Sequence, residues 1–181
     1  MTGHRLEILA KDPAMDFERD ISRIALQEEL LQFERFDAGV AWEIGNRLRG
    51  AAAAQGRGVA IDITLAGAPL FYVVTIGATP DNADWIRRKK NVVARFHKSS
   101  YAIGLNYARR NTTLEARTGA PLSEYVAAGG CFPIRLRGSA AVLGSITVSG
   151  LPERQDHELV VQALAEHLGI DPGSVALDAE G

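Results

Sequence analysis

The densest group of charged side chains in the chain lies between residues 81 and 98. The stretch begins with the acids Asp81 and Asp84 and then carries six lysines and arginines. These are Arg87, Arg88, Lys89, Lys90, Arg95 and Lys98. An acidic start and a basic continuation stabilise any helix through its dipole, and a pair such as Asp84 with Arg88 contributes only about 0.2–0.5 kcal/mol. A solvated helix is therefore one interpretation of this pattern.

The density of positive charge in an acidic protein supports a second interpretation, a ligand-binding site. Cations spread around a helix cannot all face water, and one that approaches the core is costly unless an anion meets it. That anion would belong to a small ligand or to a partner subunit. The candidate binding residues of this stretch are Asp81, Asn82, Trp85, Arg87 and Arg88.

Two glycines before a short apolar segment mark a second candidate. Gly129 and Gly130 allow a ligand or a neighbouring subunit to approach the main chain, although a plain turn into a strand explains them equally well. Pro133 cannot donate to a strand ladder, which favours a sheet edge or the first turn of the strand. An exposed edge needs protection, so the segment favours a homo-oligomer in which a partner subunit covers it. Gly130, Phe132 and Arg135 are its candidate binding residues.

The junction of a strand and a helix at residues 149–157 is the third candidate. Free N–H groups at a helix start can hold an anion, which makes Ser149 a candidate binding residue. The junction contains neither Gly-x-x-x-x-Gly-Lys-[Ser/Thr] nor Gly-x-Gly-x-x-Gly, so it is neither a phosphate loop nor a dinucleotide fingerprint. His157 precedes an apolar helical stripe, where a histidine more often completes the core edge than acts as a ligand or base. We retain both interpretations of His157.

Composition and motifs disfavour several classes of function. Cys131 is the only cysteine, which excludes an intramolecular disulfide and a multi-cysteine metal site, and no His-x-x-x-His pair or Ser/His/Asp signature assigns a metal ligand or a catalytic residue. A net charge of −2 and a pI of about 6.1 disfavour nucleic acid as a partner. No apolar run reaches the roughly 20 residues that span a bilayer, and the N-terminus lacks the apolar region of a signal peptide. We expect a cytoplasmic protein without a membrane partner, and its status as an enzyme stays open.

Hydrophobic periodicity predicts one α+β domain that positions these candidates. A first helix is expected from Ile21, a second is capped by Asp37, another is capped by Thr79 with Pro80 in its first turn, and the last ends near Leu168. Two hairpins supply the strands, at residues 59–66 with 70–76 and at residues 132–137 with 142–148. The expected organisation is an N-terminal arm over residues 1–20, a single domain over 21–168 and a tail over 169–181.

The order of these pieces resembles the haem-degrading HbpS-like superfamily, which includes GlcG-like proteins and the C-terminal domain of PduO. The resemblance runs from Gln27 to Leu168. Its landmarks are Ala60-Ile61-Asp62 with the Gly-Ala-Pro-Leu turn, the helix start at Asp81, the segment from Gly129 to Arg135, and Val148-Ser149-Gly150 followed by Asp156. The stretch from Thr79 to Lys89, together with Ser149-Gly150-Leu151-Pro152, is similar to one branch that is catalogued as an uncharacterised protein family.

The resemblance implies a profilin-like antiparallel sheet of about five strands flanked by helices, a symmetric homo-oligomer, and a site for haem or another small anionic ligand. Haem needs an apolar slot, cations for two propionates and an axial ligand. The side chains available for these roles are Trp85 and Phe132, then Arg87, Arg88 or Arg135, then His97 or His157. Because Cys-x-x-Cys-His is absent, haem would bind without covalent attachment.

Two functions are compatible with these features. The first is a cytoplasmic oligomeric protein that binds haem or another small carboxylate-bearing ligand. The second is a non-enzymatic assembly or adaptor protein, in which the arginine-rich helix forms a subunit or partner interface.

Overall fold

Four antiparallel strands in the order β2-β1-β4-β3 form the sheet of this protein, for which a computed structural model describes residues 16–177. The strands are β1 (Ala60–Leu65), β2 (Ala68–Val74), β3 (Cys131–Ile134) and β4 (Gly144–Ser149). Ile61 pairs with Val73 on one side and with Val148 on the other, so β1 lies inside the sheet. The two hairpins predicted from the sequence are confirmed.

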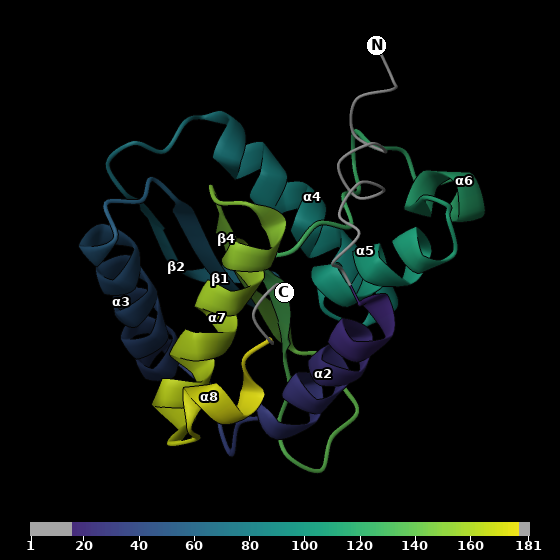
Figure 1. The fold of residues 1–181 in the computed structure, drawn as a ribbon. Coiled ribbons are helices and arrows are strands. Elements are labelled where there is room, and N and C mark those ends of the chain that lie inside the picture. The colour runs from purple at the N-terminus through teal and green to yellow at the C-terminus, as the bar shows by residue number, and fades with distance from the viewer. Residues whose placement is uncertain (1–15, 178–181) are drawn as a thin grey trace.

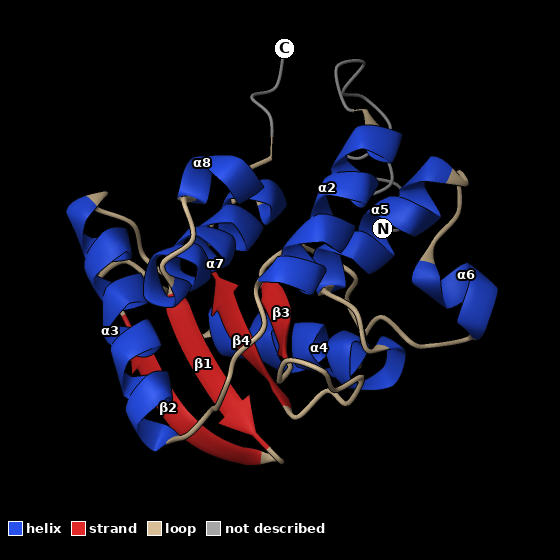
Figure 2. Cartoon of the chain, turned by 90° about the horizontal axis from the view of Figure 1, so that it is seen from below, coloured by secondary structure: helices blue, strands red, loops and turns tan. Residues whose placement is uncertain are grey.

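Helices cover both faces of the sheet (Figures 1 and 2). Their bounds are α2 (Phe17–Leu30), α3 (Ala38–Ala54), α4 (Asp81–Phe96), α5 (Ser100–Arg109), α6 (Leu114–Thr118), α7 (Glu153–Leu168) and α8 (Pro172–Val175). Helices α3 and α7 pack on one face, whereas α4 crosses the opposite face over β1, β4 and β3. Helices α2 and α5 lie together at the β3 side of the molecule.

The two faces of the sheet differ in chemistry because side chains alternate along each strand. Ile61 and Ile63 point into the main apolar core with α3 and α7. Asp62 and Thr64 alternate with them, and they lie against α4, where Lys90 binds both. Helix α4 therefore packs on a face that contains buried polar groups, and any cation on its inner side must find a partner there.

Local signals explain most of the element boundaries. Asp37 caps α3 as predicted, since its carboxylate accepts the Val40 N–H at 3.0 Å. The prediction that Thr79 caps α4 is wrong. Pro80 occupies the cap position, and the Asn82 side chain accepts the Thr79 N–H at 2.7 Å instead.

The expectation of about five strands is corrected to four for the described residues. The segment that could have formed a fifth lies beside the end of β3, where Phe33 donates its N–H to Arg135 O and accepts from Arg137 N–H, both at 2.9 Å. Because α2 ends at Leu30 and α3 begins at Ala38, the segment between them pairs through this one bridge and then turns away.

The ends of the chain differ from the expected boundaries. Helix α2 begins at Phe17, before the predicted start at Ile21, and its buried Asp20 pairs with Arg154 of α7. Beyond the predicted end of the domain, the short helix α8 buries Val175. Residues 1–15 and 178–181 lie outside the described residues, so the division into arm, domain and tail stays a prediction.

Two glycines in α3 provide a matched test of this packing. A Cβ at Gly45 would lie 2.5 Å from the Phe71 ring of β2, whereas a Cβ at Gly50 meets nothing within 4 Å. Gly45→Ala should lower the free energy of unfolding by about 1–3 kcal/mol through overpacking. Gly50→Ala should raise it by up to about 1 kcal/mol, because alanine favours the helix. Urea denaturation measures both, and equal effects at the two positions would contradict the packing of α3 on β2.

Candidate ligand-binding site between α4 and α7

A buried ion pair joins α4 to α7 across the end of β4. The Lys89 ammonium lies 2.8 Å from Asp156 Oδ2, and the two side chains are only 3% and 2% exposed. Lys89 also donates to Val148 O at 3.1 Å. Lys89 reaches this position because it follows Ile86 and precedes Val93 on the inner face of α4, at helical spacing.

The carboxylate of Asp156 is held by more than the lysine. It accepts the N–H of Leu151 at 3.0 Å and the N–H of Gly150 at 3.4 Å, both from the loop that leads from β4 into α7. Burial raises the pKa of Asp156 above its usual value, while Lys89 and the two N–H donors act in the opposite direction. The carboxylate is thus a structural anchor that fixes the loop and the first turn of α7.

Gly130 is required by the same ion pair. Its φ is +115°, and an added Cβ would lie 2.4 Å from Val148 O and 2.9 Å from Lys89 Nζ. Because glycine has no side chain, the main chain just before β3 can pass close to the lysine. Close packing of this segment accounts for Gly130 without a ligand.

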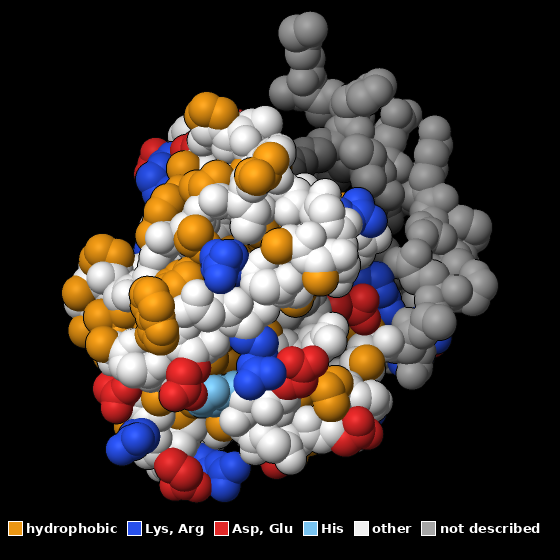
Figure 3. Space-filling model, turned by 90° about the vertical axis from the view of Figure 1, so that its left-hand side faces the viewer, with side chains coloured by type: hydrophobic (Ala, Val, Ile, Leu, Met, Phe, Trp, Pro, Cys, Tyr) orange, Lys and Arg blue, Asp and Glu red, His pale blue; other side chains and the backbone are white. Residues whose placement is uncertain are grey.

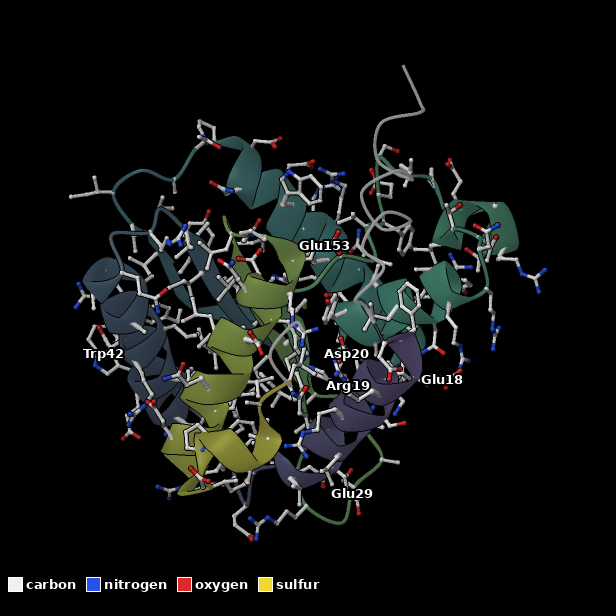
Figure 4. All side chains as sticks on the ribbon, in the orientation of Figure 1. Glu18, Arg19, Asp20, Glu29, Trp42 and Glu153 are labelled. Carbon is white, nitrogen blue, oxygen red and sulfur yellow. The ribbon has the colours of Figure 1, made fainter. Side chains whose placement is uncertain are left out.

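A small pocket of about 200 Å³ opens above the ion pair, between the first turns of α4 and α7. Its lining residues are Asn82, Trp85, Lys89, Ala128, Ser149, Gly150, Leu151, Glu153 and Asp156. Figure 4 labels Glu153 at the start of α7, beside α4. The pocket brings together Asn82, Trp85 and Ser149, three of the residues predicted from the sequence.

Trp85 forms a rigid wall of this pocket. Its indole N–H donates to Asp81 Oδ2 at 2.7 Å, and the Arg88 guanidinium stacks 4.5 Å from the centre of the ring. Arg88 is itself held by Asp84 at 2.7 Å. Asp81 and Arg88, both predicted as binding residues, therefore act by fixing the orientation of Trp85.

Two further cations of α4, Arg87 and Lys90, also bind acids within the chain. Arg87 binds Asp84 at 2.9 Å and Glu124 at 2.7 Å, and Lys90 binds Asp62 at 2.8 Å. Carboxylates therefore do meet these cations. The carboxylates come from the chain itself, so these cations do not require an external ligand.

Three predicted residues lie away from the pocket. Arg135 donates to His97 O at the C-terminal end of α4, whereas Arg88 lies in the middle of the helix and reaches back to Asp84 and Trp85, so the two arginines do not meet at one site. Phe132 is buried in the main core. His157 is buried between Tyr101 and Phe132, with Nε2 2.8 Å from Gln27 Oε1. Burial lowers the pKa of His157 to about 3, so the ring is neutral at physiological pH.

Sequence reasoning missed Lys89, Glu153 and Asp156 as pocket residues. A signal existed for Lys89, because it interrupts the apolar stripe of α4 with a charge that the fold must neutralise. Its partner Asp156 is 67 residues away, and only the fold shows that the two meet.

A larger hollow of about 370 Å³ lies between the start of α3 and the end of α7. His167, which sequence reasoning did not single out, borders it, with Nδ1 3.4 Å from Glu43 Oε2. Arg35 and Arg137 also line it, and both are largely exposed and paired with acids. We regard the smaller pocket as the stronger candidate because Lys89 and Asp156 in its lining are buried and held by hydrogen bonds.

Other kinds of site find little support in the described part of the chain. Within residues 16–177, no three histidine, cysteine, aspartate or glutamate residues come together to hold a metal ion. Burial raises the pKa of Cys131 to about 11, which keeps its thiol protonated. None of the helices in this range is long and apolar enough to cross a bilayer.

Removing Lys89 tests whether the ion pair is as important as its burial indicates. Lys89→Met leaves the buried carboxylate of Asp156 without its cation, and should lower the free energy of unfolding by about 3–5 kcal/mol. Adding Asp156→Asn should recover much of the loss, because the amide oxygen can still accept from Leu151. Arg87→Met removes two exposed ion pairs, with Asp84 and Glu124, and should cost no more than about 1 kcal/mol. A loss in Lys89→Met as small as that in Arg87→Met would disprove the anchoring role.

Comparisons with known proteins place this fold in a family. Residues 36–165 match the family described as haem degrading protein HbpS-like. A UPF0303 protein of Burkholderia vietnamiensis is 52% identical over 91% of this chain and 99% of its own length. The crystal structure of the Ybr137w protein is 29% identical, with a TM-score of 0.76 over 82% of this chain and 87% of that one.

A crystal structure of a PduOC–haem complex shares the fold. It is 14% identical, with a TM-score of 0.61 over 72% of this chain and 93% of that one. The match over residues 36–165 and the identity to the Burkholderia protein lead to the same conclusion: this chain belongs to the HbpS-like family.

Proposed function

We propose that this protein is a homo-oligomeric, cytoplasmic binding protein that holds a small carboxylate-bearing compound in the pocket between α4 and α7. The observation that carries the proposal is the Lys89 ammonium at the floor of this pocket. An ammonium donates three hydrogen bonds, and the described residues accept two of them, through Val148 O and Asp156. The third N–H can serve a carboxylate in the pocket.

The rest of the lining suits a short polar compound. Asn82 uses its side-chain oxygen to accept from Thr79, so its amide nitrogen can donate to the ligand. Ser149 supplies a hydroxyl, and the fixed Trp85 ring supplies a flat wall. The pocket volume of about 200 Å³ corresponds to roughly six or seven water molecules.

Charge further restricts the ligand. Glu153 and Asp156 also line the pocket, so a second carboxylate on the ligand would meet like charges. We therefore favour a monocarboxylate that also carries a hydroxyl or an amine. The proposal is one of binding, because His157 and Cys131 lie in the core rather than in the pocket.

Haem is a second candidate ligand, and its proposed site is the larger hollow between the start of α3 and the end of α7. The pocket between α4 and α7 is smaller than the roughly 300–1,000 Å³ that encloses drug-sized ligands. The hollow of about 370 Å³ offers His167 as an axial ligand, with Glu43 near its other ring nitrogen, and Arg35 and Arg137 for two propionates. The family description and the haem complex of similar fold motivate this alternative.

An assembly or adaptor role is the third candidate. Arg87 and Arg88 would then bridge subunits, but both already bind carboxylates of their own chain. If Arg88 bridges subunits, Arg88→Glu should lower the mass of the assembly measured by light scattering. If Arg88 only orients Trp85, the same substitution should leave that mass unchanged.

Fluorescence can test the first proposal, because Trp85 and Trp42 are the two tryptophans of the chain. In a Trp42→Phe background, short hydroxy- and amino-monocarboxylates should change Trp85 emission saturably. Asn82→Ala should weaken binding about tenfold, equivalent to about 1.4 kcal/mol, because it removes one donor. His167→Ala should leave this binding unchanged.

The same variants are titrated with haemin to test the second candidate ligand. A saturable Soret shift that His167→Ala abolishes and Asn82→Ala preserves would favour haem at the larger hollow. If neither the monocarboxylates nor haemin bind saturably, both ligand proposals are wrong.

A further inference from the structure

We propose that the open edge of β2 is the surface through which two copies of this chain pair, strand against strand. The inference rests on the proposed homo-oligomer and names its interface. Strand β2 ends the sheet order of the described residues, so one side of its backbone faces away from β1.

The hydrogen-bond pattern shows which residues face outward. Thr75 donates its N–H to Val59 O at 2.9 Å, in the same register that pairs Val73 with Ile61. In an antiparallel ladder, bonded residues alternate with residues that point to the other side. The N–H and C=O groups of Tyr72 and Val74 therefore face the open edge.

This edge carries none of the charges that usually protect an edge strand. Residues 63–80 contain no lysine, arginine, aspartate or glutamate. Natural edges are commonly blocked by charged side chains, prolines or bulges. Strand β2 has no charge, and its Pro69 and its register shift lie before Tyr72 and Val74, which leaves the second half of the edge available for pairing. Two identical uncharged strands can approach each other without like-charge repulsion.

The opposite edge of the sheet is different, which corrects the expectation that a partner subunit must cover the segment around Pro133. The Ser100 hydroxyl of α5 accepts the Cys131 N–H at 3.1 Å, and Pro133 has no N–H to satisfy. Phe33 then bridges to the chain just after β3. The β3 edge is therefore largely covered from within the chain.

Exposed apolar side chains flank the β2 edge. Trp42, Tyr72, Val74 and Ile76 are 64%, 50%, 50% and 99% exposed, and they are four of the six large hydrophobic residues that are exposed within residues 16–177. Trp42 lies on the outer side of α3, with its ring centre 6.0 Å from that of Phe71 (Figure 4). Figure 3 shows this side of the molecule, where hydrophobic side chains gather and charged ones lie mostly toward the lower part of the view.

The size of this surface suits a second copy. The four side chains expose on the order of 500 Å² of mostly apolar surface, which is within the size range of the largest apolar patch on a typical monomer, a patch that is often functional. Strand pairing would add main-chain and neighbouring area, which approaches the roughly 800 Å² per partner of a specific interface.

A two-fold axis at Tyr72 gives the simplest arrangement. Tyr72 would then exchange both main-chain hydrogen bonds with its twin, and the two sheets would become one continuous sheet of eight strands. The same patch of each copy meets itself, with Trp42 closing the interface on the α3 side and Val74 on the other.

Light scattering of the purified chain provides the test. The wild-type mass should be an even multiple of 19.5 kDa. Val74→Lys places a charge on the edge and should halve the mass, because each pair separates. Leu122→Lys changes an equally exposed leucine elsewhere and should leave the mass unchanged.

Hydrogen exchange gives a readout that does not depend on a variant. The amides of Tyr72 and Val74 have no strand partner within residues 16–177, so strong protection of both in the wild type supports pairing. An oligomer whose Tyr72 and Val74 amides exchange freely would rule out this interface. An oligomer whose mass is unchanged in Val74→Lys would do the same. Neither result would contradict the proposal that the protein is a homo-oligomer. A wild-type mass of 19.5 kDa would overturn both, and the fluorescence titration would still test ligand binding separately.

Discussion

The meeting of the Lys89 ammonium with the Asp156 carboxylate is the constraint on which the rest of the structure depends. Removing both charges from water costs several kcal/mol each, and only close contact and further hydrogen bonds offset that cost. The further hydrogen bonds come from the main chain: Val148 O accepts from Lys89, and the N–H groups of Leu151 and Gly150 donate to Asp156. The position of α4, the loop after β4 and the first turn of α7 are therefore coupled.

The same constraint explains why a pocket exists at this point. Helix α4 crosses the polar face of the sheet and α7 covers the apolar face, so the two helices approach each other only beyond the end of β4. Lys89 and Asp156 join the middle of α4 to the first turn of α7, while Trp85 is fixed by Asp81 and Arg88. Hydrogen bonds and ion pairs therefore fix the Trp85 wall of the hollow and its floor of Lys89 and Asp156.

Sequence patterns predicted the elements whose signals are local. The period-2 alternation from Val59 identified β1, and Asp37 identified the start of α3, because both depend on residues close in sequence. The inner position of Lys89 was also visible as an interruption of an apolar stripe. Its partner was not, since Asp156 lies 67 residues away and reaches it only through the sheet topology.

The errors have equally physical causes. A count of charges cannot show that Arg87 finds Glu124 in the chain, so an external anion stayed open beside the interpretation of a solvated helix. The fifth strand came from resemblance alone, and the short segment around Phe33 forms only one bridge. His157 was retained as a candidate because sequence does not reveal that Gln27 satisfies it in the core.

The most direct test of the central ion pair is NMR of the lysine ammonium groups in protein labelled with ¹⁵N-lysine. An exposed ammonium exchanges its protons with water too quickly to be seen at neutral pH, whereas a buried and hydrogen-bonded one exchanges slowly. We expect a slowly exchanging ammonium signal that disappears in Lys89→Met and shifts when a monocarboxylate binds. If no lysine ammonium of the folded protein is protected from exchange, the buried ion pair does not exist, and the proposed pocket loses its foundation.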